Sequence, residues 1–265
     1  MNKTELLDKY ARDGESRLLL ARVLDQQQRA DQRGIPTHTA FLSPAEQAMS
    51  ADLLMAAAPG QGVLHGGYAD AERKLWGFLP DWLDEDLWLA GEDCPLAALE
   101  VKTPKGAKLT HRDYLGSLMG LGITREKIGD ILIGETGAQV IVLRETLPIL
   151  LAQWEKAGRY PVTLTPLPLD QLTPTPGETK EVRATVASVR LDAVVSAGFS
   201  IPRSRAADLI RGGRVMVNHR PCEKADKVVE AGDVLTCRGL GKCVLTEIGG
   251  TSKRGRTILT LQRYL

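Results

Sequence analysis

Apolar residues are spaced most regularly between residues 190 and 218, and there they predict two short helices followed by a strand. In the first helix they recur at i, i+3 and i+4: Leu191, Val194 and Val195. Gly198 is expected to end this helix, and Ser200 with Pro202 to start the next one. The apolar residues of the second helix share one arc: Ala206, Ala207, Leu209 and Ile210. Gly212-Gly213 predicts its end, and residues 214–217 then form the strand.

The first part of the chain predicts a small α/β domain over residues 1–83. Residues 1–40 mix apolar and charged positions as helices do, and Gly34-Ile35-Pro36 closes them. Ser43-Pro44-Ala45-Glu46 is a capping box with proline at the first helical position, so a helix should run to about Ala58. A turn at residues 59–62 and two short strands, 63–68 and 74–79, complete the domain.

Residues 84–168 show strand and helix patterns in the order βαββαβ, which predicts a ferredoxin-like (RRM-like) middle domain. The expected strands and helices are 96–101, 110–120, 131–133, 139–143, 147–157 and 162–167. Its strands carry aliphatic residues such as Val140 and Val142 instead of the aromatics on which an RRM stacks bases. We therefore expect no base stacking on this sheet.

Residues 169–181 are rich in proline and predict an extended linker, so that residues 182–265 form the last domain. After its helices we expect strands at 233–237, 242–248 and 257–261, joined by basic, glycine-containing turns. The fold class is therefore α+β, with three small units and the helix-helix-strand module in the last.

Charge divides the chain sharply although the total is nearly neutral. Residues 182–265 contain 15 Lys and Arg against 7 Asp and Glu, a net charge of 15 − 7 = +8. The whole chain has 34 and 33, so residues 1–181 carry 19 − 26 = −7. A basic module on an acidic body is typical of a nucleic-acid-binding protein, whereas a merely solvated face usually mixes both signs.

The cationic residues left after the apolar faces are assigned are the candidate RNA contacts. They are Arg190, Arg203, Arg205, Arg211, Arg214, Lys227, Arg238 and Lys242, and Ser204 is expected beside them as a hydrogen-bonding RNA contact. A second, weaker RNA surface is expected at Arg112, Arg125 and Lys127, where solvated charges are the alternative. His111 is expected to pack at a helix start, Asp113 to favour the helix N-terminus and Asp130 to lie in a turn.

Two segments resemble known families. RLDAVVSAGFSIPRSRAADLIRGGRVMVN, residues 190–218, resembles the RNA-binding domain named after small-subunit ribosomal protein S-four, the αL motif. LTHRDYLGSLMGLGITREKIGD, residues 109–130, resembles the central signature of the YlmH family, which pairs such a middle domain with a C-terminal domain of this type. The resemblance implies a bacterial, ribosome-associated protein that binds the large subunit with peptidyl-tRNA in quality control of stalled translation. It also implies a link to cell-division gene neighbourhoods.

Signatures of catalysis, cofactors and metals are weak, so we expect a non-enzyme without a cofactor. His111-Arg112-Asp113 lacks the asparagine of a kinase loop, and the loop 250–257 has arginine where a phosphate-binding loop needs lysine. The four cysteines form no CxxC pair, and zinc at Cys222, Cys237 and Cys243 with His219 matches no common spacing.

Partners and location follow from the same features. No signal peptide or long apolar run is evident, which predicts a cytoplasmic protein with structured RNA, rRNA or tRNA, as its partner. Two alternatives stay open: a pseudouridine synthase-like RNA-modifying enzyme, and a protein-interaction scaffold linked to cell division. In the second, the acidic domains would bind a protein partner.

Overall fold

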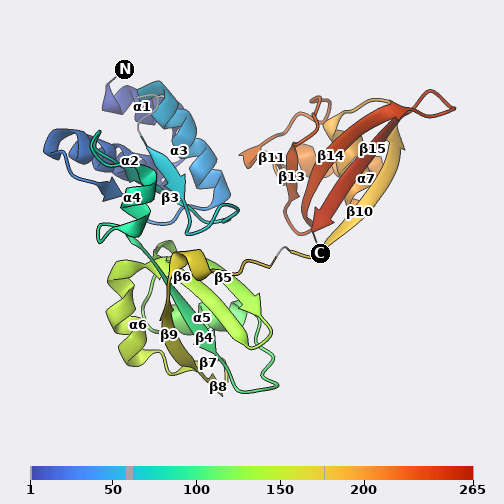
Figure 1. Ribbon diagram of the computed structural model, residues 1–265. Helices are drawn as coiled ribbons and strands as arrows, with labels where there is room; N and C mark the ends of the chain where they lie inside the picture. Colours follow the sequence, from blue (N-terminus) through green and yellow to red (C-terminus); the bar gives the residue numbers. More distant parts are fainter. Residues whose placement is uncertain (1, 58–61, 176, 265) are drawn as a thin grey trace. The chain divides into compact units, whose positions relative to one another are not determined.

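The computed structural model describes residues 2–57, 62–175 and 177–264, and the chain divides into two compact units (Figure 1). Unit 1 comprises residues 1–175 and unit 2 residues 176–265. The predicted turn at 59–62, apart from Gly62, and the predicted helix end at Ala58 lie outside the described residues. Unit 1 therefore contains both of the first two predicted domains, and unit 2 contains the basic one.

The N-terminal part of unit 1 packs three helices around a small antiparallel sheet of order β1-β3-β2. Its elements are α1 (Lys3–Tyr10), α2 (Gly14–Arg33), β1 (Thr37–His38), α3 (Pro44–Ala57), β2 (Val63–His65) and β3 (Leu75–Phe78). The predicted capping box of α3 forms: Ser43 N donates to Glu46 Oε2 at 2.6 Å, and Glu46 N donates to Ser43 Oγ at 3.4 Å. Leu20 and Leu53 are fully buried between the helices.

The second part of unit 1 forms the predicted βαββαβ unit. Its elements are α4 (Glu85–Ala90), β4 (Leu96–Lys102), α5 (His111–Gly120), β5 (Ile128–Gly134), β6 (Gly137–Leu143), α6 (Leu147–Gln153) and β9 (Thr163–Leu167), with a small hairpin of β7 (Lys156–Ala157) and β8 (Tyr160–Pro161). The antiparallel order β5-β6-β4-β9 is that of a ferredoxin-like sheet. Helix α6 ends at Gln153, earlier than predicted, because the chain turns into the β7–β8 hairpin.

Both faces of this sheet are buried. Val140 and Val142 pack under α5 and α6, whereas Ile141 and Leu143 face the other way. That second face is covered by Phe41 and Leu75 from the N-terminal part of the same unit and by Trp88 from α4. The face on which an RRM would stack bases is therefore filled by the protein's own core.

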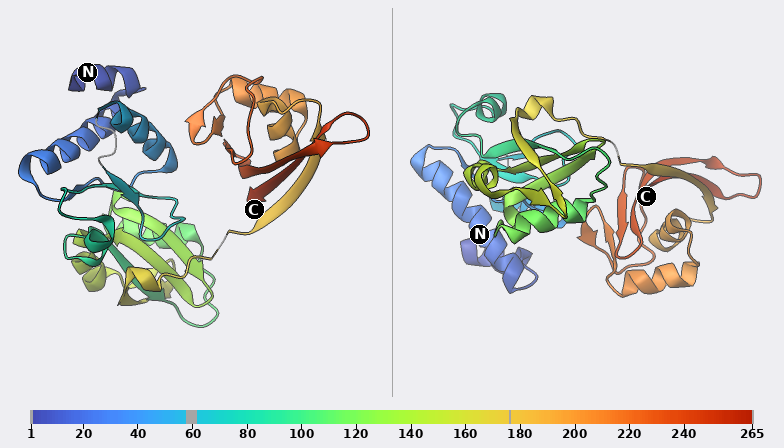
Figure 2. Two further views of the ribbon diagram at one scale, coloured as in Figure 1. Left: turned by 45° about the horizontal axis from the view of Figure 1, so that its top comes forward. Right: turned by 90° about the horizontal axis from the view of Figure 1, so that it is seen from below.

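Unit 2 is a six-stranded sheet of order β10-β15-β14-β13-β11-β12 with two helices on one face (Figure 2). Its elements are β10 (Thr179–Val186), α7 (Leu191–Phe199), α8 (Arg203–Arg211), β11 (Val215–Val217), β12 (Arg220–Pro221), β13 (Val234–Cys237), β14 (Gly241–Thr251) and β15 (Thr257–Tyr264). Strand β10 begins inside segment 169–181, predicted as linker, and pairs with β15 from Thr179 to Val186. The linker prediction is wrong there because Thr179, Lys180 and Glu181 pair with β15, in a strand that continues to Val182 and Val186 in the core.

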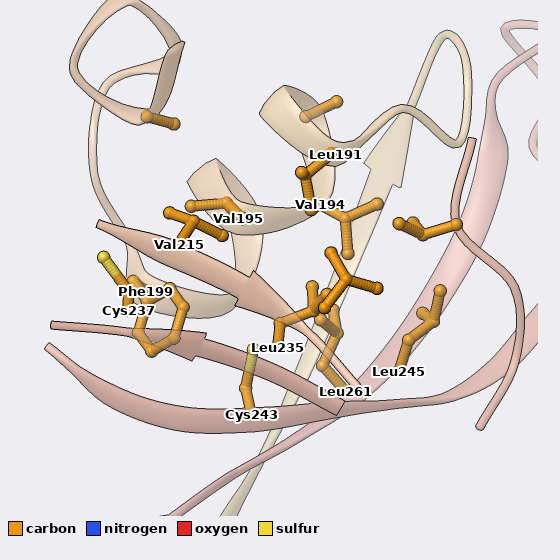
Figure 3. Close-up of a cluster of buried hydrophobic side chains, with 14 of the residues drawn as sticks. Leu191, Val194, Val195, Phe199, Val215, Leu235, Cys237, Cys243, Leu245 and Leu261 are labelled. Atoms are coloured by element: carbon orange, nitrogen blue, oxygen red, sulfur yellow. The ribbon is translucent and has the colours of Figure 1, made fainter. Parts of the chain in front are cut away.

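The core of unit 2 lies between the helices and the sheet (Figure 3). Leu191, Val194 and Val195 from α7 reach down onto Leu235 and Leu261. All five side chains are fully buried. The apolar pattern that defines α7 in the sequence is therefore also the pattern that attaches it to the sheet.

Candidate nucleic-acid interface

Helix α7 ends in a way that the glycine pattern did not predict. Gly198, expected as the stop, lies within the helix, and a Cβ there would come within 2.8 Å of Cys243 Sγ. Ser200, expected to start the second helix, is instead the C-cap of α7, with a left-handed φ of 56°. Both predictions are wrong because Gly198 serves close packing, whereas Ser196 Oγ holds the turn by donating to Ile201 O at 2.6 Å.

Helix α8 starts directly after Pro202 and no side chain caps it. It buries Ala206, Ala207 and Ile210, as the apolar arc predicts. The predicted glycine stop is confirmed, since Gly213 has a φ of 65° just beyond the C-cap Gly212. The other side of α8 is left to Arg203, Ser204, Arg205 and Arg211, all of which are exposed.

Asp192 in the first turn of α7 holds two of the candidate arginines. Its side chain is only 9% exposed, and Arg203 donates to it from Nε to Oδ2 at 3.0 Å and from Nη2 to Oδ1 at 3.2 Å. Arg190 Nε lies 3.4 Å from the same carboxylate. Burial alone would raise the pKa of Asp192, but the hydrogen bonds and charge of Arg203 and the charge of Arg190 outweigh it and hold the pKa below its usual value. One buried carboxylate thus orients the guanidinium of Arg203 by hydrogen bonds and forms an ion pair with that of Arg190.

A second arginine pair lies at the strand that follows α8. Arg214 Nη2 donates to Arg238 O at 3.3 Å, and Arg238 N donates to Arg214 O at 2.9 Å. Arg205 is close enough that its charge acts, with that of Arg214, on the Cys237 thiol. The pKa of Cys237 is nevertheless raised, because burial outweighs both positive charges. The fold thus brings Arg214 and Arg238 together.

The remaining candidates fall into different places. Arg211 forms an exposed ion pair of 3.3 Å with Asp208. Lys227 is exposed and lies near Arg190, since the carbonyl of Lys227 accepts a hydrogen bond from Leu191 N. Lys242 does not join them: its neighbour Cys243 faces the core, so Lys242 lies on the sheet face opposite to the helices, with Nζ 4.2 Å from the Tyr264 ring centroid. We name the residues on the helix side, Arg190, Arg203, Ser204, Arg205, Arg211, Arg214, Lys227 and Arg238, the cationic surface.

The weaker surface predicted in the middle domain is dispersed. Arg125 donates from Nη1 to the carbonyls of Ile128 at 2.6 Å and Gly129 at 3.3 Å, and burial with the nearby Arg73 lowers its pKa to about 10. Lys127 pairs with Glu145 at 2.9 Å, both side chains being exposed. Arg112 is exposed on α5. Arg125 is therefore engaged in holding the backbone of unit 1.

The sequence did not point to Arg73, which completes this arrangement. Arg73 donates to the carbonyls of Ile128 at 2.9 Å and Phe41 at 3.1 Å, and so joins the two parts of unit 1. Asp130, expected in a turn, instead lies in β5 and accepts bonds from Tyr68 Oη at 2.9 Å and from the amides of residues 72 and 73. The arginine between two charged neighbours in Glu72-Arg73-Lys74 gave no signal of this role.

Two further expectations concern the start of α5. Asp113 forms the capping box with Thr110, accepting from Thr110 N at 2.7 Å, which confirms its predicted position at the helix start. His111, expected to pack, is exposed instead. Partial burial and the charge of Arg125 nevertheless lower the pKa of His111.

The described residues offer little for metal chemistry. Across residues 2–57, 62–175 and 177–264, no group of three or more His, Cys, Asp or Glu side chains is arranged to hold a metal ion. Burial raises the pKa of Cys243 to about 12, so its thiol stays protonated within the core. Within the same ranges, no helix combines the length and apolar character needed to cross a membrane.

Comparison with known proteins accounts for most of the chain. Three family models match: "YlmH, N-terminal" at residues 15–77, "Putative RNA-binding domain in YlmH" at residues 90–171, and "S4 domain" at residues 189–235. Helices α7 and α8 and strand β11 lie within the S4 match. The two models matched at residues 90–171 and 189–235 describe RNA-binding domains and support an RNA-binding role.

Two known proteins are similar over long stretches. "Cell division protein ylmH from Streptococcus pneumoniae" is a solved structure with 24% sequence identity and a TM-score of 0.49, covering 61% of this chain and 96% of that one. "Ribosome-associated protein quality control protein P2" of Bacillus subtilis (strain 168) is 36% identical over 231 residues, which are 85% of this chain and 86% of the relative. Together with the three matched models, this identity shows that the chain belongs to the YlmH family.

Proposed function

We propose that unit 2 binds structured RNA of the large ribosomal subunit, tRNA, or both, through the cationic surface. One observation carries the proposal: exposed guanidinium groups are gathered around α7, α8 and β11 and held in place by a buried carboxylate and by backbone carbonyls. A guanidinium with a fixed orientation loses little side-chain freedom when it binds phosphate. The net charge of +8 over residues 182–265 favours the same partner.

The mode of binding follows from the side chains present. Phe199 is buried in the core of unit 2 and Tyr264 lies under Lys242, so neither offers a stacking platform on the cationic surface. Arginine forks bind phosphates in pairs of hydrogen bonds, and Ser204 at the start of α8 adds a donor. We therefore propose that RNA is recognised by the shape and spacing of its backbone.

The cellular role proposed is ribosome-associated quality control of stalled translation, without catalysis. Its support is the Bacillus subtilis relative, whose name assigns that protein to ribosome-associated protein quality control. A non-catalytic role is favoured because the matched models describe RNA-binding domains. Residues 1–181 carry a net charge of −7, which repels RNA phosphate. This part of the chain is therefore better suited to binding a protein partner.

Sedimentation of native lysate through sucrose gradients, at low and moderate salt, tests the proposal. We expect the protein to travel with large ribosomal subunits, and the double variant Arg211→Glu/Arg214→Glu to remain at the top. Both side chains are exposed, so the variant should unfold at nearly the same temperature as the wild type. The matched control is Arg29→Glu/Arg33→Glu on the exposed side of α2, which changes charge equally and should still travel with the subunits.

Other results would contradict parts of the proposal. Slow sedimentation of the wild type at both salts would exclude the ribosomal partner. Purified protein should bind RNA with a log–log salt slope of about −4, as expected for about five neutralised phosphates, and a flat response would exclude phosphate contacts. Base modifications that vanish on deletion would favour an RNA-modifying enzyme, and binding that survives RNase would favour a scaffold.

A further inference from the structure

The hairpin of β14 and β15 is the basic feature of unit 2 that the cationic surface does not include. The S4 match ends at residue 235, before β14 begins at Gly241. Residues 248–264 contain four cations and no Asp or Glu: Lys253, Arg254, Arg256 and Arg263. Three of these four lie in the connection between the two strands, so positive charge is concentrated at the tip of the hairpin.

The tip, residues 252–256, is a closed and anchored loop. Ser252 N donates to Arg256 O at 2.7 Å, and Gly255 N donates to Ser252 O at 2.9 Å, with Gly255 in a left-handed conformation. Arg256 then reaches strand β10, where Nη2 donates to Thr185 O at 2.6 Å and Nε to Thr185 Oγ1 at 3.3 Å. The side chain of Arg256 is therefore used to fix the loop against the sheet.

Lys253 and Arg254 are in a different situation from Arg256. Both are exposed, and within the part of the chain that the structure describes neither side chain forms a hydrogen bond or ion pair. Their charges are therefore not compensated by the protein, while the loop that carries them is held in place. Because the loop is already ordered, little conformational free energy is lost when an anion binds to these two side chains.

The hairpin also places the tip away from the cationic surface. Strand β14 has register shifts between Leu245 and Glu247 and between Ile248 and Thr251, which increase local twist. In Figure 1 and in both views of Figure 2, the loop projects from the end of the sheet opposite to β11. The strand register agrees: Val215 pairs with Cys237, and Cys237 pairs with Gly241 at the start of β14, whereas the tip follows the other end of β14 at Thr251.

We propose that the β14–β15 tip is a second RNA contact, which binds backbone phosphates of the same RNA through Lys253 and Arg254. The inference deepens the proposed function and depends on it. RNA is favoured over an acidic protein because the tip offers cations on a slender loop with little apolar surface, and protein interfaces need a buried apolar centre. Contacts at both ends of the sheet would fix the orientation of unit 2 along the RNA.

Salt dependence of RNA binding tests this inference directly. The full chain is titrated against a fluorescein-labelled RNA hairpin with a stem of about 16 base pairs, a length that spans successive minor grooves. We expect Lys253→Ala/Arg254→Ala to reduce the magnitude of the log–log slope by about 1.4 to 1.8, the loss of two phosphate contacts. Affinity at about 0.1 M salt should fall about 25- to 60-fold. Arg29→Ala/Arg33→Ala removes the same charge from unit 1 and should change neither quantity.

The outcomes separate this inference from the proposed function. If Arg211→Glu/Arg214→Glu abolishes binding while the tip variant keeps the wild-type slope and affinity, the tip is no RNA contact and the cationic surface stands. If the wild type does not bind this RNA, both proposals fall. If the tip variant binds RNA normally but loses binding to purified large subunits, the tip contacts protein and the inference is overturned. Folding of each variant is checked by protection of the buried thiols of Cys237 and Cys243 from alkylation.

Discussion

In unit 1 the guanidinium groups of Arg73 and Arg125 meet at one backbone carbonyl, that of Ile128, whereas in unit 2 those of Arg190 and Arg203 meet at one carboxylate, that of Asp192. The first pair is half-buried, and partial burial lowers the pKa of both groups. The second pair is about half exposed, with side-chain exposures of 41% and 52%. The same residue type therefore serves two different tasks.

The acceptors explain the difference. The carbonyls of Ile128 and Gly129 lie in β5 and that of Phe41 lies in a separate segment, so Arg73, which donates to both Phe41 and Ile128, fastens these two segments together. A carboxylate carries one negative charge, so the two arginines around it retain a net charge of +1. Exposure and acceptor type together thus distinguish a structural arginine from one available to phosphate, which charge counting along the sequence cannot do.

The largest effect is expected from Arg73→Ala. It leaves the carbonyls of Phe41 and Ile128 without these donors at the junction of the two parts of unit 1, and should lower the free energy of unfolding by about 3 kcal/mol. Urea unfolding followed by tryptophan fluorescence measures this directly, because all four tryptophans belong to unit 1: Trp76, Trp82, Trp88 and Trp154.

Arg112→Ala is the matched control, since this arginine is exposed on α5, and it should change the free energy by less than about 0.5 kcal/mol. RNA affinity of folded Arg73→Ala should equal that of the wild type. A strong loss of RNA binding without loss of stability would show that Arg73 contacts RNA, and the distinction between the two arginine pairs would fail.

A smaller effect is expected from Asp192→Asn in unit 2. The amide keeps the shape but not the charge that holds Arg203, so stability at pH 7 should fall by about 1.5 kcal/mol. The difference in free energy of unfolding between the wild type and the variant depends on pH. Because the pKa of Asp192 is depressed in the folded state, its contribution is complete above about pH 4, the unfolded value, and is lost as pH falls through the lower folded value.

Pulsed alkylation in urea reports on unit 2 separately, since Cys237 and Cys243 are buried there and Cys94 is buried in unit 1. At pH 7 the variant should expose the unit 2 thiols to alkylation at a lower urea concentration than the wild type does. The urea concentration at which Cys94 becomes labelled should not change. Calorimetry should then show the wild-type and variant transitions converging as pH falls below about 4. A constant difference from pH 7 to pH 3 would mean that Asp192 acts through packing and not through its charge.

Sequence patterns predicted the elements whose apolar residues alternate or recur over several turns. The βαββαβ order and the α7–α8–β11 module follow from such runs, because burying one face requires that spacing. Strand β10 was missed because prolines and charges precede it closely, although Val182, Ala184 and Val186 alternate. Its pairing with β15, more than 70 residues later, is a tertiary contact that a local pattern does not reveal.

The residues of the candidate site likewise differ in how far the sequence predicted their positions. Charge and spacing selected Arg203, Arg205 and Arg214, which the fold places on one side of unit 2. They also selected Arg125 and Lys242, whose positions depend on which carbonyl or sheet face lies next to them. No sequence pattern pointed to Asp192, because an acidic residue is not expected among RNA contacts. Its carboxylate nevertheless pairs with Arg190 and Arg203.

The smallest effect is expected from Ser200→Gly in the turn between α7 and α8. Ser200 is exposed with a left-handed φ of 56°, a conformation that glycine adopts without steric cost, so the variant should gain about 0.5 kcal/mol in unit 2. Ser204→Gly, in the first turn of α8, should instead lose about as much. RNA affinity of Ser200→Gly should stay unchanged, because Asp192 and not the turn orients Arg203. A stabilised variant with weaker RNA binding would show that the strained turn, and not the carboxylate, sets the position of this guanidinium.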